Sequence, residues 1–306
     1  MQRIPLWGWI AFAVLVSSLL AIDLFAHRAK HGASRRSAYI WSGIWIAAGL
    51  LFSLFVWFVF GARQAQEYLA AYLIEKSLSL DNLLVFLIIF QSLAIPREYQ
   101  HNVLYWGIFG ALLFRAVFIF LGIAAIERFE WVTYVFAAIL LLAAWHALRK
   151  DVTALEANKM VKWLARHLPV TPRIHGSRFF VRQNGRLRAT PLLLALVGLE
   201  LTDIVFAIDS VPAALAVSRN RFVVYSSNVF AILGLRALYS ALAHALTGLR
   251  YLHIGLAGVL AFAAVKIIVD EWVPIHPLAA VGITALLIGG AVWFSLLGGK
   301  DSNNER

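Results

Sequence analysis

The sequence contains no cysteine, and charged side chains are scarce in it. Without cysteine the chain can form no disulfide, no thiolate metal site and no c-type haem attachment. Only 14% of its residues are charged, compared with about 25% in an ordinary soluble domain. Apolar residues take their place: 61% of the residues are hydrophobic, and the mean hydropathy is +0.78. This composition predicts a single polytopic membrane domain covering residues 1–306, rather than two soluble domains.

The sequence also lacks the motifs of common enzymes and of nucleotide-driven pumps. There is no GxxxxGK[ST] phosphate-binding loop, no HExxH zinc motif and no GxSxG nucleophile elbow. We therefore expect no enzymatic activity and no tightly bound cofactor.

Nine apolar segments are long enough to cross a bilayer, which takes about 20 residues in a helix. The first segment is interpreted as a retained helix and not a signal peptide. A basic stretch follows it, and an A-x-A cleavage pattern does not. The sequence thus predicts an all-α membrane protein with about nine transmembrane helices. By residue number the segments are 5–25, 40–61, 68–95, 101–125, 130–149, 190–217, 221–247, 251–270 and 275–297.

Basic residues concentrate in two loops, which predicts the orientation of the chain. The loop after the first segment holds four Lys or Arg and no acid, and the loop 150–189 holds nine Lys or Arg and two acids. Loops on the opposite side are short and nearly neutral. Since basic loops stay in the cytoplasm, we expect the N-terminus outside and the C-terminus inside. The net charge of +11 is then mainly a topogenic signal, and no nucleic-acid partner is expected.

Charged residues in the two halves of the chain repeat with nearly the same spacing. Asp81 precedes Arg115 by 34 residues, and Asp203 precedes Arg236 by 33 residues. Three helices separate equivalent elements, so the two halves would cross the membrane in opposite directions. This pattern is typical of inverted-repeat transporters, which bind substrate near the midplane where the repeats meet.

The inverted repeat divides the membrane domain into five parts. Each repeat would contain three helices, and the remaining helices would surround this core. The peripheral helices, the first repeat, the basic cytoplasmic loop, the second repeat and the final helix are expected at 5–61, 68–149, 150–189, 190–270 and 275–297.

Two short acidic runs, residues 75–82 and 200–210, lie inside apolar segments. A carboxylate at the centre of a membrane helix costs about 2.5–3.5 kcal/mol, so these acids need compensation, and a cation is the simplest candidate. Carboxylate, amide and hydroxyl oxygens suit hard divalent ions such as Mg²⁺, Mn²⁺ and Ca²⁺. The candidate metal ligands are Glu75, Asp81, Asn82, Glu200, Asp203, Asp209 and Ser210.

Helix geometry brings some of these acids together and separates others. Glu200 and Asp203 are three residues apart and can converge on one face. Asp209 is nine residues from Glu200, which is half a turn away on a continuous helix. We expect Pro212 to break or bend the helix locally and so bring Asp209 toward the other two.

Four basic residues in or near the same apolar segments are candidate charge partners for the acids: Lys76, Arg115, Arg236 and Lys266. These bases leave a second interpretation open. The acids and bases could form structural ion pairs between helices, in a membrane scaffold or assembly protein with no metal site.

Three runs in these segments carry a resemblance to a known family. The runs are YLIEKSLSLDN at 72–82, ELTDIVFAIDSVP at 200–212 and SNVFAILGLRA at 227–237. The chain resembles the TerC family of integral membrane proteins, and within it the Alx-type branch. The resemblance implies export of manganese from the bacterial cytoplasm across the inner membrane, and a link to metal homeostasis.

The resemblance also implies roles for particular positions. The acidic positions of the family fall on Glu75, Asp81, Glu200, Asp203 and Asp209, and Asn82, Ser210 and Asn228 also match. His146 departs from the pattern, because a lysine is expected there, as at Lys266.

We therefore hypothesise a secondary transporter that exports a divalent cation, most specifically Mn²⁺, and is compatible with proton coupling. Its partners are the metal ion and the lipid bilayer. Glu75 and Asp81 would face Glu200, Asp203 and Asp209 across a pseudo-two-fold axis in the membrane plane.

Overall fold

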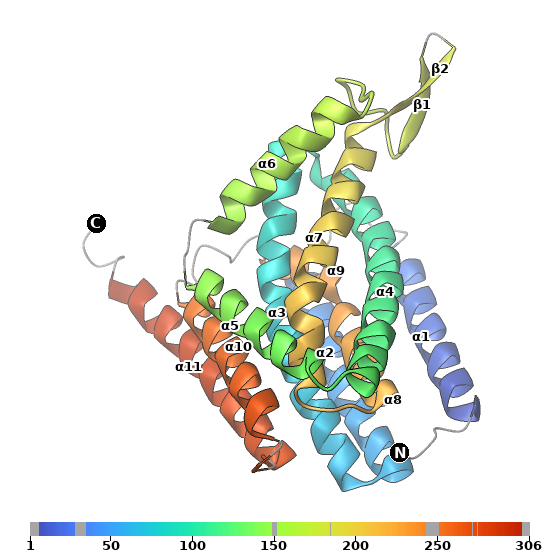
Figure 1. Cartoon of the computed structure of the whole chain (residues 1–306). Helices are drawn as coiled ribbons and strands as arrows, with labels where there is room; N and C mark the ends of the chain where they lie inside the picture. Colours follow the sequence, from blue (N-terminus) through green and yellow to red (C-terminus); the bar gives the residue numbers. More distant parts are fainter. Residues whose placement is uncertain are drawn as a thin grey trace.

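The computed structural model describes residues 6–27, 35–148, 152–183, 185–242, 251–270, 272–273 and 275–301. The described part of the chain is a bundle of helices with one short β-hairpin at an end of the bundle (Figure 1). In chain order the elements are α1 (Leu6–His27), α2 (Arg35–Phe60), α3 (Ala62–Ser92), α4 (Arg97–Arg128), α5 (Val132–Ala147), α6 (Val152–His167), β1 (Phe180–Gln183), β2 (Arg186–Ala189), α7 (Pro191–Leu215), α8 (Arg221–Ile232), α9 (Leu235–Leu242), α10 (Leu252–Val269) and α11 (Pro277–Asp301).

The helical membrane architecture expected from the sequence is confirmed in its coarse form. Among the residues that the structure describes, six helical stretches are long and apolar enough to cross a membrane, and the apolar helices Trp7–Ile22 and Val132–Ala147 are shorter. Helix α3 covers the third predicted segment but is not among the six. The count of nine spans therefore stays a prediction. The six are Arg36–Phe60, Arg97–Arg128, Pro191–Leu215, Arg221–Ala241, Leu252–Val269 and Pro277–Ser295.

The predicted helix 221–247 is interrupted, because α8 ends at Ile232 and α9 begins at Leu235. Gly234 in the interruption has a φ of +83°, a conformation that residues with a Cβ rarely adopt. A Cβ on Gly234 would also overlap the side chain of Trp45 on α2. Glycine is therefore required here both by the backbone and by the close approach of α2. Residues 243–250 of the predicted segment lie outside the described residues.

Helix α7, by contrast, is not broken at Pro212, and this corrects the expected interruption. The helix is continuous from Pro191 to Leu215, with Pro212 buried inside it. The backbone N–H of Ala216 donates to the carbonyl of Pro212 at 2.8 Å. Proline lacks the N–H that would donate to the carbonyl four residues earlier, and its ring crowds that carbonyl. Pro212 lies only three residues before the end of α7, and the residues around it are buried, so packing keeps the helix continuous.

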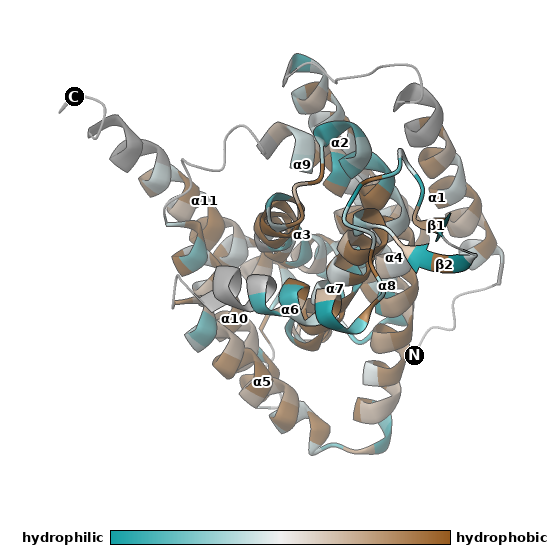
Figure 2. Ribbon diagram, turned by 90° about the horizontal axis from the view of Figure 1, so that it is seen from above, coloured by the Kyte–Doolittle hydropathy of each residue, from teal (hydrophilic) through white to brown (hydrophobic). Residues whose placement is uncertain are grey.

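The basic loop 150–189 contains regular structure of its own. Helix α6 lies across the end of the bundle and packs against α3 and α7, and its residues Val161 and Leu164 are buried. Strands β1 and β2 pair antiparallel, with Phe180 opposite Ala189. Viewed along the bundle, β2 is hydrophilic while the helices behind it are largely hydrophobic (Figure 2).

Four helices from the two halves of the chain pack around one another at the centre of the bundle. Helix α3 packs against α7 and α8, α4 packs against the same two helices, and α5 packs against α10. The N-terminal helices join this core through aromatic rings. The ring centroid of Phe52 is 4.5 Å from that of Phe230, and Phe12 and Phe222 are 5.4 Å apart. Helices α1 and α2 thus contact α8 through these rings.

The requirement for glycine at position 234 gives a first prediction. Gly234→Ala should destabilise the protein, by about 1–3 kcal/mol, because the new side chain meets both an unfavourable φ and Trp45. The measurement is the thermal unfolding midpoint of the purified protein in detergent. Gly289→Ala is the matched control, since no atom lies within 4 Å of its added Cβ and it sits inside helix α11. Equal midpoints for the two variants would contradict the prediction.

Candidate functional site

A buried arginine on α4, Arg115, contacts acids from two other helices. Its guanidinium forms an ion pair with Glu75 on α3, and its Nη2 lies 3.3 Å from Oδ1 of Asp203 on α7. Nη1 also donates to Oδ1 of Asn228 on α8 at 2.9 Å. The side chains of Glu75, Arg115 and Asp203 are between 0% and 4% exposed. Four helices, two from each half of the chain, therefore meet at one guanidinium.

The sequence of α4 explains why Arg115 points inward. The buried residues of this helix recur every three or four positions and so form one face of it. Arg115 occupies the centre of that face, between buried Ala111 and Ile119. A charge on the lipid-facing side of a spanning helix would be far more costly than one that meets two carboxylates. The buried residues are Val103, Leu104, Gly107, Ala111, Arg115, Ile119, Gly122, Ile123 and Ile126.

Several polar atoms around this ion pair keep unused hydrogen-bonding capacity. Among the described residues, Oε2 of Glu75, Oδ2 of Asp203, Nε of Arg115 and Oγ of Ser210 are buried without a hydrogen-bond partner. Buried polar groups are usually satisfied, so such atoms call for an explanation. The oxygens among them are of the kind that bind hard cations.

Glu200 lies one turn from Asp203 on α7 and packs against the backbone of α4. A Cβ on Gly110 would overlap the Glu200 carboxylate, so the carboxylate fits only because residue 110 is glycine. Glu200 is half-buried, and its Oε2 has no hydrogen-bond partner in the described part of the chain. The sequence did not by itself single out Gly110, although this glycine lies five residues before Arg115 in the same apolar segment.

The remaining acidic candidates are placed differently from one another. Asn82 is buried on α3, whereas the side chain of Asp81, on the same helix, is outside the described residues. Asp209 is half-buried on α7. Because α7 is continuous through this region, Asp209 stays half a turn from Glu200, on a different face.

The candidate charge partners also differ in what they contact. Arg115 pairs with two of the acids, as described above. Lys76 on α3 donates from Nζ to the carbonyl of Ala231 at 3.0 Å, close to the end of α8. A cation is favourable at that end, because the last carbonyls of a helix lack partners within it and carry partial negative charge. Arg236 is buried on α9.

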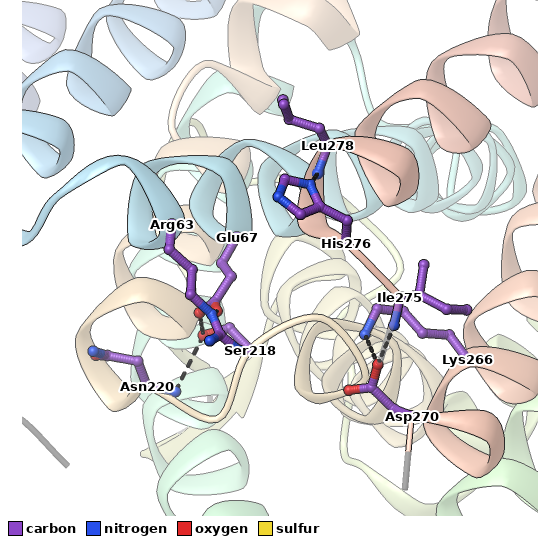
Figure 3. Close-up of polar contacts among 9 residues, drawn as sticks. All are labelled: Arg63, Glu67, Ser218, Asn220, Lys266, Asp270, Ile275, His276 and Leu278. Atoms are coloured by element: carbon purple, nitrogen blue, oxygen red, sulfur yellow. Dashed lines mark hydrogen bonds and ion pairs between the residues drawn. The ribbon is translucent and has the colours of Figure 1, made fainter. Parts of the chain in front are cut away.

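Two further positions lie at the far ends of their helices. Lys266 is buried on α10 and pairs with Asp270 at 3.2 Å, and the backbone N–H of Ile275 donates to the same carboxylate (Figure 3). Lys266 thus compensates a carboxylate at the end of its own helix. His146 is exposed in the last turn of α5.

At the end of the bundle opposite α6, polar contacts join the two halves. Ser218, after α7, donates to Glu67 on α3 at 2.6 Å, and Arg63 pairs with the same carboxylate (Figure 3). Arg221 on α8 pairs with Glu127 on α4 at 2.7 Å. These contacts are partly exposed, unlike the ion pair at Arg115.

The acids do not form a ready metal cluster in this structure. Within the described ranges, no three Asp, Glu or His side chains lie close enough together to hold a metal ion. What the structure brings together is two acids, one amide and an arginine. The five-carboxylate site stays a prediction, and it would require these helices to rearrange.

Comparison with known proteins gives the family. The model of the TerC family, described as integral membrane protein TerC family, matches residues 60–303. This chain belongs to the TerC family. It is 41% identical over 292 residues to an uncharacterized membrane protein, STKORF319, of Myxococcus xanthus, and this covers 94% of this chain and 92% of that one.

Two other relatives carry a more specific name. The putative membrane-bound redox modulator Alx of Escherichia coli strain K12 is 39% identical over 91% of this TerC protein and 90% of its own length. The protein of the same name from Salmonella typhi is also 39% identical, over 91% and 89%. No solved structure matches the chain. None of these names carries an enzymatic activity.

The burial of the ion pair at Arg115 gives a second prediction. Arg115→Met should lower the stability of the protein by about 3 kcal/mol or more, because it leaves two buried carboxylates without a cation. Arg221→Met is the control with the same change in the partly exposed pair with Glu127, and it should cost at most about 1 kcal/mol. The measurement is unfolding of both variants in chelator. Equal unfolding midpoints for the two variants would contradict the prediction.

Proposed function

We propose that this TerC protein exports a divalent metal cation, most specifically Mn²⁺, from the bacterial cytoplasm. The observation that carries the proposal is the meeting of Glu75 and Asp203 with Asn228 inside a membrane-spanning bundle. These side chains come from three different helices, and Glu75 and Asp203 retain buried oxygens that have no hydrogen-bond partner in the described ranges. Acids at such positions in membrane proteins are expensive and mark ion pathways.

The ligand chemistry supports a hard cation. Carboxylate and amide oxygens would come from Glu75, Asp203 and Asn228, and the hydroxyl of Ser210 is buried two turns after Asp203 on α7. With Arg115 counted, the two acids leave a net charge of −1 at the centre of the bundle. Oxygen ligands and negative charge favour Mn²⁺ and Mg²⁺ over softer ions. In the proposal Asp81, Glu200 and Asp209 contribute to other steps of the ion path, when the helices rearrange.

The packing of the helices supports alternating access by two inverted halves. If α3 is exchanged with α7, α4 with α8 and α5 with α10, each main contact becomes another observed contact. The α3–α8 contact becomes the α7–α4 contact, while α3–α7, α4–α8 and α5–α10 are unchanged. A pseudo-two-fold relation of this kind is the basis of rocking mechanisms in transporters.

The proposed membrane is the bacterial inner membrane, with the N-terminus outside. The basic segment with α6 and the hairpin would then face the cytoplasm, where positive loops are retained. The opposite end would face outward, with the contacts of Glu67 to Ser218 and of Glu127 to Arg221. Proton antiport is one source of energy compatible with this arrangement.

A second candidate function is favoured by the ion pair itself. Arg115 compensates Glu75 and Asp203 without any metal, as a structural pair in a membrane scaffold would. The name of the Alx relatives points to redox modulation, but a chain without cysteine has no thiol to exchange. The scaffold candidate predicts no ion flux through the purified protein.

Reconstituted transport separates the two candidates. Wild-type protein in liposomes should move Mn²⁺ under a proton gradient, and Glu75→Gln, Asp203→Asn and Asp209→Asn should each lower the flux at least about tenfold. The protein must insert normally, which is checked by its yield and monodispersity. Glu127→Gln is the control and should keep wild-type flux.

Two results would contradict the transport proposal. The first is wild-type flux in all five acid-to-amide variants, at Glu75, Asp81, Glu200, Asp203 and Asp209. The second is the absence of Mn²⁺ flux in wild-type protein under every proton gradient, which would favour the scaffold.

The contact between Gly110 and Glu200 gives a more local prediction. Gly110→Ala should displace the Glu200 carboxylate and lower Mn²⁺ flux several-fold with little loss of stability, because a flexible side chain can move aside. Gly107→Ala, one turn earlier on the same face of α4, is the matched control, since its Cβ would meet Leu199 at an ordinary 3.5 Å. Equal flux in the two variants would remove Glu200 from the ion path.

A further inference from the structure

We propose that Arg115 is a tethered cation that competes with the metal ion for Glu75 and Asp203. It would hold the two acids in the metal-free protein and leave them when the metal binds. This inference rests on the proposed function, because it assumes that these acids are the ones that bind the transported ion. It assigns to Arg115 a role beyond structural pairing.

The first argument is that the arginine and a metal would need the same oxygens. Arg115 reaches Glu75 and Asp203 at once, and it also takes Oδ1 of Asn228. A guanidinium is charged at every physiological pH, so it cannot yield its place by losing a proton. A dication that enters between the two carboxylates must therefore displace it.

The second argument is the balance of charge. Glu75, Asp203 and Arg115 together carry −1, and a divalent ion added to all three would give +1 in the interior of the bundle. If the guanidinium moves to Glu200, the two carboxylates with the dication are neutral, and so is the pair of Arg115 with Glu200. Because burying an uncompensated charge is costly in a membrane, the neutral combination is favoured.

The third argument is that the displaced guanidinium has an acceptor within the same helix interface. Glu200 lies on α7 three residues before Asp203, against Gly110 of α4, the helix that carries Arg115. Its buried Oε2 has no hydrogen-bond partner among the residues that the structure describes. A shift of the guanidinium toward Glu200 would satisfy both groups, and Nε of Arg115 is also without a partner there.

Displacement of Arg115 would also change the contacts between helices. In the structure the guanidinium links α4 to α3, α7 and α8. Metal binding would replace these links by bonds from Glu75 and Asp203 to the ion, and would release α4 from them. The arginine would thus make the metal-free and metal-bound states differ in packing, as alternating access requires.

Equilibrium binding of Mn²⁺ to purified full-length protein tests the inference without transport. The free Mn²⁺ concentration is followed by electron paramagnetic resonance. Arg115→Met should bind Mn²⁺ at least about tenfold more tightly than wild type, because the competitor is gone, and Arg115→Lys should fall between them. Arg221→Met is the control at the partly exposed end and should leave the Kd unchanged.

Added guanidinium ion provides a second readout. In Arg115→Ala, millimolar guanidinium should raise the apparent Kd for Mn²⁺, because it occupies the vacated position between Glu75 and Asp203. In wild type the same concentration should have no effect, and in both proteins equal sodium chloride controls for ionic strength.

A purely structural arginine predicts the opposite results. Mn²⁺ affinity that is unchanged or weaker in monodisperse Arg115→Met, or in Arg115→Lys if the first variant does not fold, would overturn the inference. If these variants transport Mn²⁺ at the wild-type rate and their Kd is unchanged, the inference is refuted and the transport proposal stands. If Arg115→Met binds Mn²⁺ more tightly but the wild-type protein shows no flux, the transport proposal alone is refuted.

Discussion

The need to compensate charge inside a membrane determines how the centre of this bundle is built. A buried guanidinium is stable only if carboxylates meet it, and a buried carboxylate only if a cation meets it. Arg115, Glu75 and Asp203 satisfy each other in this way, and they come from α4, α3 and α7. The relative positions of these three helices are therefore fixed by charge as well as by apolar packing.

A related constraint applies to the backbone at the interruption between α8 and α9. A break in a membrane helix leaves carbonyl groups that water cannot reach, so the protein must satisfy them. Lys76 donates to one of these carbonyls, at Ala231, and Gly234 lets the chain turn beside Trp45. Lys76 thus donates a hydrogen bond to the interrupted helix, while its neighbour Glu75 pairs with Arg115.

These two features give the proposed transport a physical basis. Irregular backbone and paired charges at the centre of a bundle are the parts that transporters rearrange. A carrier needs its binding acids to be compensated when no ion is bound, and in the proposal Arg115 does this for Glu75 and Asp203. The TerC family membership and the Alx relatives are consistent with a membrane protein of this type.

The sequence by itself determined the helical membrane class, most helix positions and the family, since long apolar runs and the acidic motifs are local features. Only the tertiary structure decided that Arg115 pairs with Glu75 and Asp203. Spacing alone also placed the helix break wrongly. Whether a proline or a glycine interrupts a helix depends on what packs against it. The pairing of Arg115 with Asp203, 88 residues away, depends on how distant helices pack together.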